Sequence, residues 1–466
     1  MDVFSAVLCV IFTTIAASYA WGMRGAVIGG EKGAMLPGVF IGTVLAWFSG
    51  GAIRENFWII AAAGLMGMTF GGTETYGETI GMVLHRGRAD YRPVKGYAGL
   101  AVKGALWFSV CGGFIAFAFS AMSGSVYSTA DIVIFCVLIP VIQQVGYRVF
   151  NKPYDKARGI HPQIYYSVTR REEWGSNLAL VFAMLTLAVI KNDGLMLTML
   201  SCGLIAGSAG WVAAMKAYEY SVFPMSNGRY LFDKIYRKGI FDGWKLMEFI
   251  LGAAGGLGLS IGFCTQYDVI EKYNRIIEEK GRFSPLAHFE EFMPYAAALF
   301  VFAILIINIY QFVCGKRGKK VNSFICDQIE RPFYNVAPML LVLLGSLSVA
   351  RIMTAFMLIF VCTVKCAFDR FEKAKFVYLL QAVMLAVCAA VFAGDIILGG
   401  YSPFMIMVAG TVPYLLMEFV WVVSDSRRNK MPLKSAITKT AFATVFPCFC
   451  VMSAVILLIS YKIFEF

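Results

Sequence analysis

Charged residues are scarce in this chain. Lys, Arg, Asp and Glu together make up 15% of its 466 residues, whereas hydrophobic types make up 59%. A soluble globular chain is about half apolar and about a quarter charged. The composition therefore excludes an ordinary soluble protein and indicates an integral membrane protein.

The chain also lacks the motifs of several enzyme classes. It has three histidines, His85, His161 and His288, and all of them fall in or beside predicted loops. There is no H-E-x-x-H motif and no Walker A motif, so neither a zincin-type site nor a nucleotide-binding loop is expected. Alternating strands of about ten residues are missing as well, which argues against a transmembrane barrel.

The twelve cysteines show no disulfide framework. Most lie within apolar stretches, and the closest pair, Cys448 and Cys450, fits no disulfide, redox or zinc spacing. Cysteine in such a setting acts as a small hydrophobic residue in helix packing. No metal and no cofactor are expected.

Long apolar runs, in contrast, are abundant. Runs of roughly 18 to 25 residues recur along the chain, and each can cross a hydrocarbon core as a helix. The sequence predicts an all-α integral membrane protein, a polytopic bundle of about 14 transmembrane helices, with a range of 12 to 14. The predicted spans are 3–20, 34–52, 57–81, 98–121, 131–149, 176–190, 194–214, 246–264, 293–313, 334–349, 352–367, 376–398, 402–423 and 440–463.

The stretch 21–38 departs from this pattern. It combines several glycines with Arg24, Glu31, Lys32 and Pro37, and it resembles neither a plain loop nor a plain helix. Glycine and proline at membrane depth indicate a broken or re-entrant segment, whose freed backbone groups bind ions or anionic groups. A tight cytoplasmic hairpin is the alternative, with the two basic residues as topology signals.

Basic residues alternate between the predicted loops. Most of the 41 Lys and Arg residues follow odd-numbered spans, as Arg86, Arg88, Arg92 and Lys95 do. Because such loops stay in the cytoplasm, both termini are expected outside, and the plasma membrane is the expected location. The segment 265–292 is then a non-cytoplasmic loop. The basic loops, which account for the net charge of +12, are expected to meet anionic lipid and not nucleic acid.

No linker rich in Gly, Ser or Pro divides the chain, so 1–466 is expected to form a single transmembrane domain. Fourteen spans divide naturally into seven and seven, and an odd-numbered repeat must be inverted. The candidate halves are 1–243 and 244–466, although their sequence identity is too slight to establish a repeat. Nothing in the sequence indicates an oligomeric state.

Residues 64–85, GLMGMTFGGTETYGETIGMVLH, carry the most unusual pattern. On a continuous helix, their small and polar residues would form one stripe with almost no side-chain bulk before the carboxylates. The glycines of the stripe, together with Pro37, are expected to serve close helix packing or gating. The stripe consists of Gly64, Gly67, Gly71, Glu74, Glu78, Gly81 and His85.

Glu74 and Glu78 are predicted in the inner half of the bilayer. Ionisable side chains at such depths are rare and usually face a cavity or a partner. Two carboxylates four residues apart repel when both are ionised, so a shared proton, a cation or a basic neighbour is expected. Arg24 and Lys32 are predicted on the same side. The alternative is a buried ion pair that only fixes helix packing.

Further polar side chains lean toward that side. Taken singly, each is interpreted as a snorkelling or helix-end residue. Together they predict an inward-facing polar vestibule, with Gln143 and Gln144 in its wall. Arg351 and Asp395 are candidates for an outer gate or a structural pair. The other vestibule residues are Lys103, Glu248 and Glu418.

These features favour a polytopic transporter over an enzyme. A secondary transporter is expected, because no nucleotide-binding motif supports an ATP-driven pump. It would couple a proton or cation to a small, anionic solute. Two alternatives stay open: a transferase acting on a lipid-linked or acyl substrate, with a carboxylate as general base, and a lipid or polysaccharide flippase. The predicted binding residues are Glu74, Glu78, Arg24, Glu31, Lys32, Gln143 and Gln144.

Overall fold

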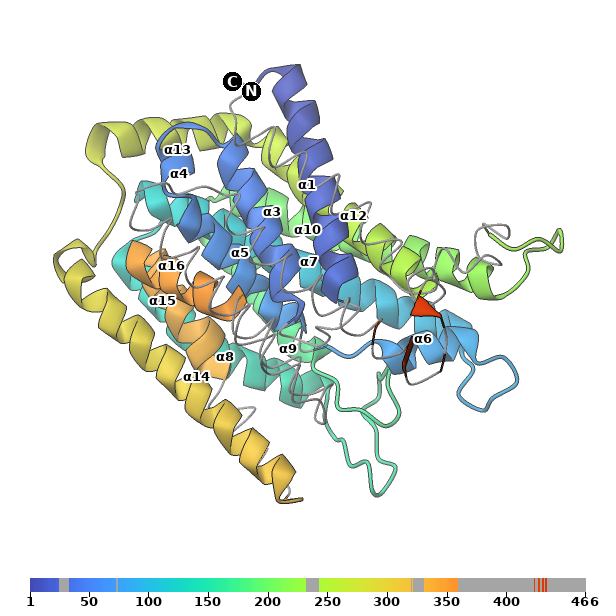
Figure 1. Cartoon of the computed structure of the whole chain (residues 1–466). Helices are drawn as coiled ribbons and strands as arrows, with labels where there is room; N and C mark the ends of the chain where they lie inside the picture. The colour runs from blue at the N-terminus through green and yellow to red at the C-terminus, as the bar shows by residue number, and fades with distance from the viewer. Residues whose placement is uncertain are drawn as a thin grey trace.

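A computed structural model describes most of the first 358 residues (Figure 1). The described part is helical, and the only strand-like feature in it is an isolated bridge between Asp155 and Ile160. The prediction of an all-α protein is thus confirmed for this part of the chain. The described residues are 1–24, 33–72, 74–231, 243–319, 321, 331–358, 423, 426, 427, 430, 432 and 433.

Seven stretches of helix in the described part are long and apolar enough to cross a membrane. They are α1 (Val3–Arg24), α7 (Pro93–Ser123), α8 (Thr129–Phe150), α9 (Trp174–Lys191), α10 (Gly194–Val222), α12 (Gly243–Thr265) and the run of η1 (Ala287–Phe292) into α14 (Met293–Lys316). Shorter helices accompany them. These are α3 (Met35–Phe48), α4 (Gly51–Glu55), α5 (Phe57–Gly72), α6 (Gly77–Leu84), α13 (Tyr267–Lys280), η3 (Pro332–Val336), α15 (Ala337–Leu343) and α16 (Leu347–Phe356).

The count of fourteen spans is not confirmed. The predicted spans 376–398 and 440–463 lie outside the described residues, as does 402–423 except for its last residue. The count and the division into halves at 243/244 therefore stay predictions.

Six helices form a ring in which each packs on the next. The order is α1, α3, α5, α7, α10 and α12, and α12 packs back on α1. Helices α8 and α9 pack together beside the ring, with α9 on α7, while α15 and α16 cover α5 (Figure 1). In this ring α1 and α7 lie opposite each other, so side chains that join them cross its interior.

Glycine allows neighbouring helices of the ring to approach closely. Gly38 of α3 and Gly64 of α5 face each other, and a Cβ on either would collide with the carbonyl oxygen of the other. Gly104 of α7 and Gly207 of α10 form a second contact of the same kind. Small residues at such positions let two backbones touch, and the van der Waals contact between them stabilises the pair.

The predicted stripe at 64–85 is not one helix, which corrects the sequence analysis. Helix α5 ends at Gly72, residues 74–76 are not helical, and α6 begins at Gly77. Consequently Glu74 and Glu78 do not share a helix face, and the expected pair of carboxylates one turn apart is absent.

The glycines of the stripe lie in different surroundings. Gly67 packs against Phe114, and Gly71 packs against Trp107, so both make the close contacts expected of packing positions. A Cβ at Gly81 would instead meet the ring of His85, on the residue that ends the same helix. A gating role for these residues stays a prediction.

Pro37 lies within a helix, although the sequence analysis placed it in the broken segment 21–38. It lies in the first turn of α3, where the backbone N–H that proline lacks would have no partner within the helix. Helix α1 continues as far as Arg24. Glu31 and Lys32 lie outside the described residues, so the idea of a re-entrant segment is untested there.

The predicted span 334–349 is broken as well. Helix α15 ends at Leu343, and Gly345 has a φ of +87°, a conformation that glycine adopts without strain. The Ser346 side chain then accepts a hydrogen bond from the N–H of Val349 and caps α16. Helix α16 begins at Leu347, five residues before the start of the next predicted span, 352–367. The end of that span lies outside the described residues.

The segment 265–292 is not an irregular loop. Helix α13 crosses the end of the bundle near the N-terminus (Figure 1), and the Asn274 side chain accepts a hydrogen bond of 2.9 Å from the N–H of Ile53. One face of α13 is buried through Ile270, Tyr273 and Ile277. The segment thus forms an amphipathic helix that closes this end of the bundle.

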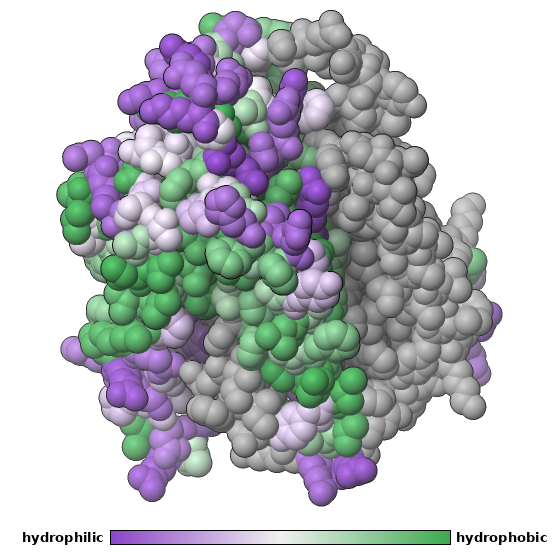
Figure 2. All heavy atoms as spheres, turned by 90° about the vertical axis from the view of Figure 1, so that its left-hand side faces the viewer, coloured by the Kyte–Doolittle hydropathy of each residue, from purple (hydrophilic) through white to green (hydrophobic). Residues whose placement is uncertain are grey.

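On the face shown in Figure 2, a hydrophobic band lies between two hydrophilic ends. On α14 the side chains of Leu299, Phe302, Ile306 and Ile309 are all exposed. A continuous apolar surface of this kind suits lipid contact and not water. The chain is therefore membrane-embedded, while the plasma-membrane location and the sidedness of the termini stay predictions.

Candidate functional site

The break between α5 and α6 places two side chains in buried polar surroundings. Glu74 and Tyr76 flank Thr75 in this non-helical stretch. Glu74 enters a group that we call the acidic cluster, formed with Lys103 and Glu172. Tyr76 enters a second group, the aromatic cluster, which is formed by Trp21, Arg24, Tyr76, Trp107, Trp211, Trp244, Lys245 and Glu248.

Lys103 is the centre of the acidic cluster. It lies about 15 Å along α7 from the start of the helix, and its side chain is 0% exposed. Its Nζ lies 3.1 Å from Glu172 Oε1 and 3.9 Å from Glu74 Oε2. It also donates to the Thr75 carbonyl oxygen at 2.5 Å and to Thr79 Oγ1 at 3.0 Å. Snorkelling, expected from the sequence, is excluded by this burial.

The two carboxylates of the acidic cluster are held differently. Glu172 Oε2 accepts a hydrogen bond of 2.7 Å from the N–H of Tyr166. Neither oxygen of Glu74 accepts a hydrogen bond of normal geometry from the described residues. One ammonium group therefore faces two buried carboxylates, and the cluster has one negative charge in excess unless it holds a proton or a cation.

Arg24 is enclosed by aromatic rings. Only 1% of this last residue of α1 is exposed. Its guanidinium carbon lies 5.1 Å from the ring centres of Trp21 and Tyr76 and 5.2 Å from that of Trp107. Cation–π attraction of this kind is stronger where water is excluded. The side chain is thus held as a cation in the ring interior.

Glu248 is fully paired within the aromatic cluster. Its Oε1 accepts hydrogen bonds from the Tyr76 hydroxyl at 3.2 Å and from Trp244 Nε1 at 2.8 Å. Lys245 Nζ donates to Oε2 at 3.1 Å and also to the Gly22 carbonyl oxygen at 2.7 Å. Glu248 lies near the start of α12, as expected from the sequence, but it is 0% exposed and does not reach solvent.

Glu78 lies apart from both clusters, on α6. Its carboxylate accepts hydrogen bonds from Ser167 Oγ at 2.6 Å and from the N–H groups of Val168 at 2.8 Å and Thr169 at 2.9 Å. Partial burial alone would raise the pKa of Glu78, but these hydrogen bonds together hold it below its usual range. In the structure Glu78 ties α6 to the loop after α8 and does not join Glu74.

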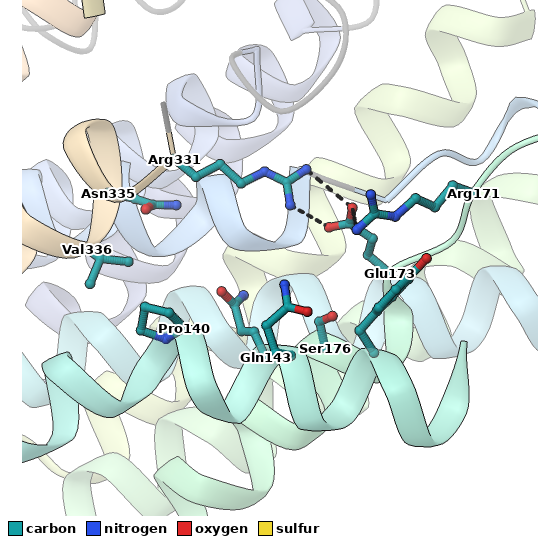
Figure 3. A pocket seen from close by; sticks show the side chains of 10 residues that line it. Pro140, Gln143, Arg171, Glu173, Ser176, Arg331, Asn335 and Val336 are labelled. Atoms are coloured by element: carbon teal, nitrogen blue, oxygen red, sulfur yellow. Dashed lines mark hydrogen bonds and ion pairs between the residues drawn. The ribbon is translucent and has the colours of Figure 1, made fainter. Parts of the chain in front are cut away.

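Gln143 and Gln144 line a polar pocket beside the acidic cluster (Figure 3). Arg331 reaches into it and donates two hydrogen bonds to Glu173, at 2.7 and 3.3 Å. Arg171 approaches the same carboxylate from the other side, at 3.4 Å. The pocket is lined by Pro140, Gln143, Gln144, Tyr147, Arg171, Glu173, Ser176, Arg331, Asn335 and Val336.

The pocket and the acidic cluster are connected by consecutive residues of the chain. Glu173 in the pocket follows Glu172 in sequence, and Asn335 Nδ2 lies 3.5 Å from Thr69 Oγ1 on α5. Gln143 and Gln144 thus lie in one polar pocket with Glu173, and the predicted inward-facing vestibule stays a prediction.

The structure describes only one of the remaining predicted residues. Arg351 lies on α16, whereas Asp395 and Glu418 lie outside the described residues. Within the described ranges, no group of three His, Cys, Asp or Glu side chains is arranged to hold a metal ion.

Comparison with known proteins gives no relative. No family model matches the chain, and no curated protein or solved structure matches it. The function must therefore be argued from the site.

Proposed function

We propose that this protein is a secondary transporter, which moves a small solute together with a proton or a cation. The observation that carries the proposal is the break between α5 and α6, with Glu74 buried beside it and accepting no hydrogen bond of normal geometry from the described residues. Interrupted membrane helices characteristically hold substrate and coupling ions, because their ends expose backbone groups and charges to a protected site.

The acidic cluster provides a link between ion binding and conformation. Lys103 contacts Glu74 and Glu172 and also the backbone carbonyl of Thr75, inside the break. When Glu74 is neutralised by a proton or paired with a cation, its pull on Lys103 weakens. The hold of Lys103 on the break then changes, so occupancy biases the balance between two arrangements of α5 and α6.

The polar pocket offers an approach to the cluster. Glu173 and Arg331 lie in its wall, and Glu172 directly precedes Glu173 in the chain. A proton or cation entering by this route meets carboxylates in succession, as in the acidic relays of many transporters. Protonation would start at Glu173 and end at Glu74.

The test is solute-driven proton movement in proteoliposomes. The purified protein is reconstituted around the pH indicator pyranine, and a panel of small carboxylates, amino acids and sugars is added outside. We expect at least one solute to acidify the lumen, and Glu74→Gln to reduce the rate at least tenfold. Glu78→Gln is the matched control and should retain the wild-type rate, because Glu78 lies outside the cluster.

Proton movement by Glu74→Gln at the wild-type rate would overturn the assignment of the coupling site. Absence of solute-driven proton or sodium movement across the whole panel would overturn the transporter. The transferase and flippase alternatives are separated by the same assay, since neither moves protons in response to a water-soluble solute.

A further inference from the structure

The aromatic cluster contains hydrogen-bond donors without acceptors. Nε and Nη1 of Arg24 are buried and have no hydrogen-bond partner among the described residues. The same is true of the indole Nε1 of Trp21, Trp107 and Trp211. Guanidinium and indole groups donate and never accept. Native interiors leave few such donors unpaired, so the cluster is suited to receive a group rich in hydrogen-bond acceptors.

The ring contacts bring these donors together. Trp21 stacks on Trp107 with ring centres 5.3 Å apart, across the interior of the helix ring. Trp107 lies 5.8 Å from Trp211, and Tyr76 lies 5.2 Å from Trp211. The unpaired groups therefore belong to one connected set of side chains and not to separate parts of the core.

The charges of the aromatic cluster indicate which kind of acceptor group would fit these donors. Arg24 and Lys245 are cations, and Glu248 is the single carboxylate that the described residues supply to them. The surplus is one positive charge, whereas the acidic cluster has one negative charge in excess. A single monovalent anion would balance the aromatic cluster, and burying a second negative charge would not be compensated.

The aromatic faces around Arg24 favour an organic anion. The faces of Trp21, Tyr76 and Trp107 surround the guanidinium, and aromatic faces pack well against an apolar or planar body. A carboxylate is a monovalent acceptor that pairs well with a guanidinium group. Inorganic phosphate, which is more highly charged and strongly hydrated, fits these walls poorly.

We propose that Arg24 and the aromatic cluster bind the carboxylate of a small monocarboxylic acid with an apolar body. This inference rests on the proposed function in one respect, that the bound acid is the transported solute. Lys103 and Trp107 lie one turn apart on α7, so the anion site and the coupling site share a helix face. An anion and a proton bound together would cross the membrane without net charge.

The test is equilibrium binding of benzoate to the detergent-solubilised protein. Binding is followed by intrinsic tryptophan fluorescence, because four tryptophans belong to the cluster. We expect saturable quenching by benzoate and at least tenfold weaker binding of benzamide, which has the same shape without the charge. Inorganic phosphate and chloride should not compete at the concentrations where benzoate saturates.

Variants separate the site from the fold. Arg24→Gln should weaken benzoate binding at least tenfold, and Arg24→Lys should restore part of it, because the charge returns without the planar fork. Arg54→Gln is the matched control, since its guanidinium also lies 5.1 Å from a tryptophan ring centre, that of Trp47, but on an exposed residue. Trp107→Phe keeps a ring and removes one donor, so binding should weaken a few-fold if Arg24→Gln does not fold.

Three results would overturn the proposal. These are no benzoate binding by the wild-type protein, equal binding by folded Arg24→Gln, and competition by chloride as effective as by benzoate. Glu74→Gln resembles the protonated carboxylate and keeps Arg24, so benzoate binding should persist while solute-driven proton movement falls at least tenfold, which distinguishes the two proposals. Benzoate binding that depends on Arg24, without solute-driven proton movement, would contradict the transporter proposal and support the anion site. Proton movement without such binding would contradict the anion site and support the transporter proposal.

Discussion

Glu74 and Glu248 are both buried glutamates beside the same helix break, yet their surroundings are opposite. Glu248 accepts hydrogen bonds from a tyrosine, a tryptophan and a lysine. Glu74 accepts none of normal geometry from the described residues, and its cation lies 3.9 Å away and closer to another carboxylate. A buried charge with every partner in place holds a structure together. A buried charge with its partners incomplete is suited to gain and lose a proton or ion.

The largest effect should come from removing the paired glutamate. Glu248→Leu leaves Lys245 buried without a carboxylate, which should lower the free energy of unfolding by about 3–5 kcal/mol. Glu74→Leu leaves Lys103 still paired with Glu172 and should cost about 1 kcal/mol or less. Thermal unfolding in detergent, followed by tryptophan fluorescence, measures both. Equal losses of stability would show that the two glutamates do not differ in the way described.

A smaller effect is expected from a single hydrogen bond. Tyr76→Phe keeps the ring against Trp107 and Trp244 but removes the hydroxyl that donates to Glu248. The loss should be about 1.5–3 kcal/mol, as for a hydrogen bond to a charged group. In the Glu248→Leu background the same change should have little further effect, because its partner is already gone. Additive losses in this double-mutant cycle would mean that the hydroxyl acts elsewhere.

The smallest effect concerns Glu78, which provides a partly exposed carboxylate for comparison. Its pKa is lowered in the folded protein, so its stabilising contribution is present above the ordinary glutamate pKa of about 4.3. The contribution disappears as the pH falls through the lowered pKa of the folded state. Because the site is exposed, the contribution should be below about 1 kcal/mol. Unfolding of wild type and Glu78→Gln should differ near pH 7 and converge near pH 3. A difference that persists at pH 3 would contradict this account.

The sequence located several members of the site but not their partners. Glu74 was singled out because charges at membrane depth are rare, and Arg24 because it lies in the unusual segment 21–38; both are buried in the structure. Lys103 and Glu248 were assigned to helix ends, because a single position in an apolar run does not reveal whether its helix is enclosed. Lys103 is buried because other helices surround α7. This packing joins segments that are distant in sequence.

The break in α5 was missed for a related reason. Regular spacing of glycines and acids is compatible with a continuous helix, and Gly71 and Gly72, which precede the break, also fit a packing stripe. What holds the break is a contact from another helix, the hydrogen bond from Lys103 to the Thr75 carbonyl. Two local spacings in the sequence belong to the site. Lys103 and Trp107 are one helical turn apart, and Lys245 comes three residues before Glu248.

The sequence by itself determined that this protein is helical and embedded in a membrane, because long apolar runs and small-residue spacing act within one segment. It also determined that Glu74 and Arg24 need partners, because a charge in an apolar segment is costly wherever the chain goes. Only the tertiary structure decided which charges meet. Lys103 pairs with Glu74 and Glu172, and Lys245 pairs with Glu248. These pairs form because the closed ring of helices sets which helix faces are enclosed together. This pairing leaves one negative charge in excess in the acidic cluster and one positive charge in excess in the aromatic cluster.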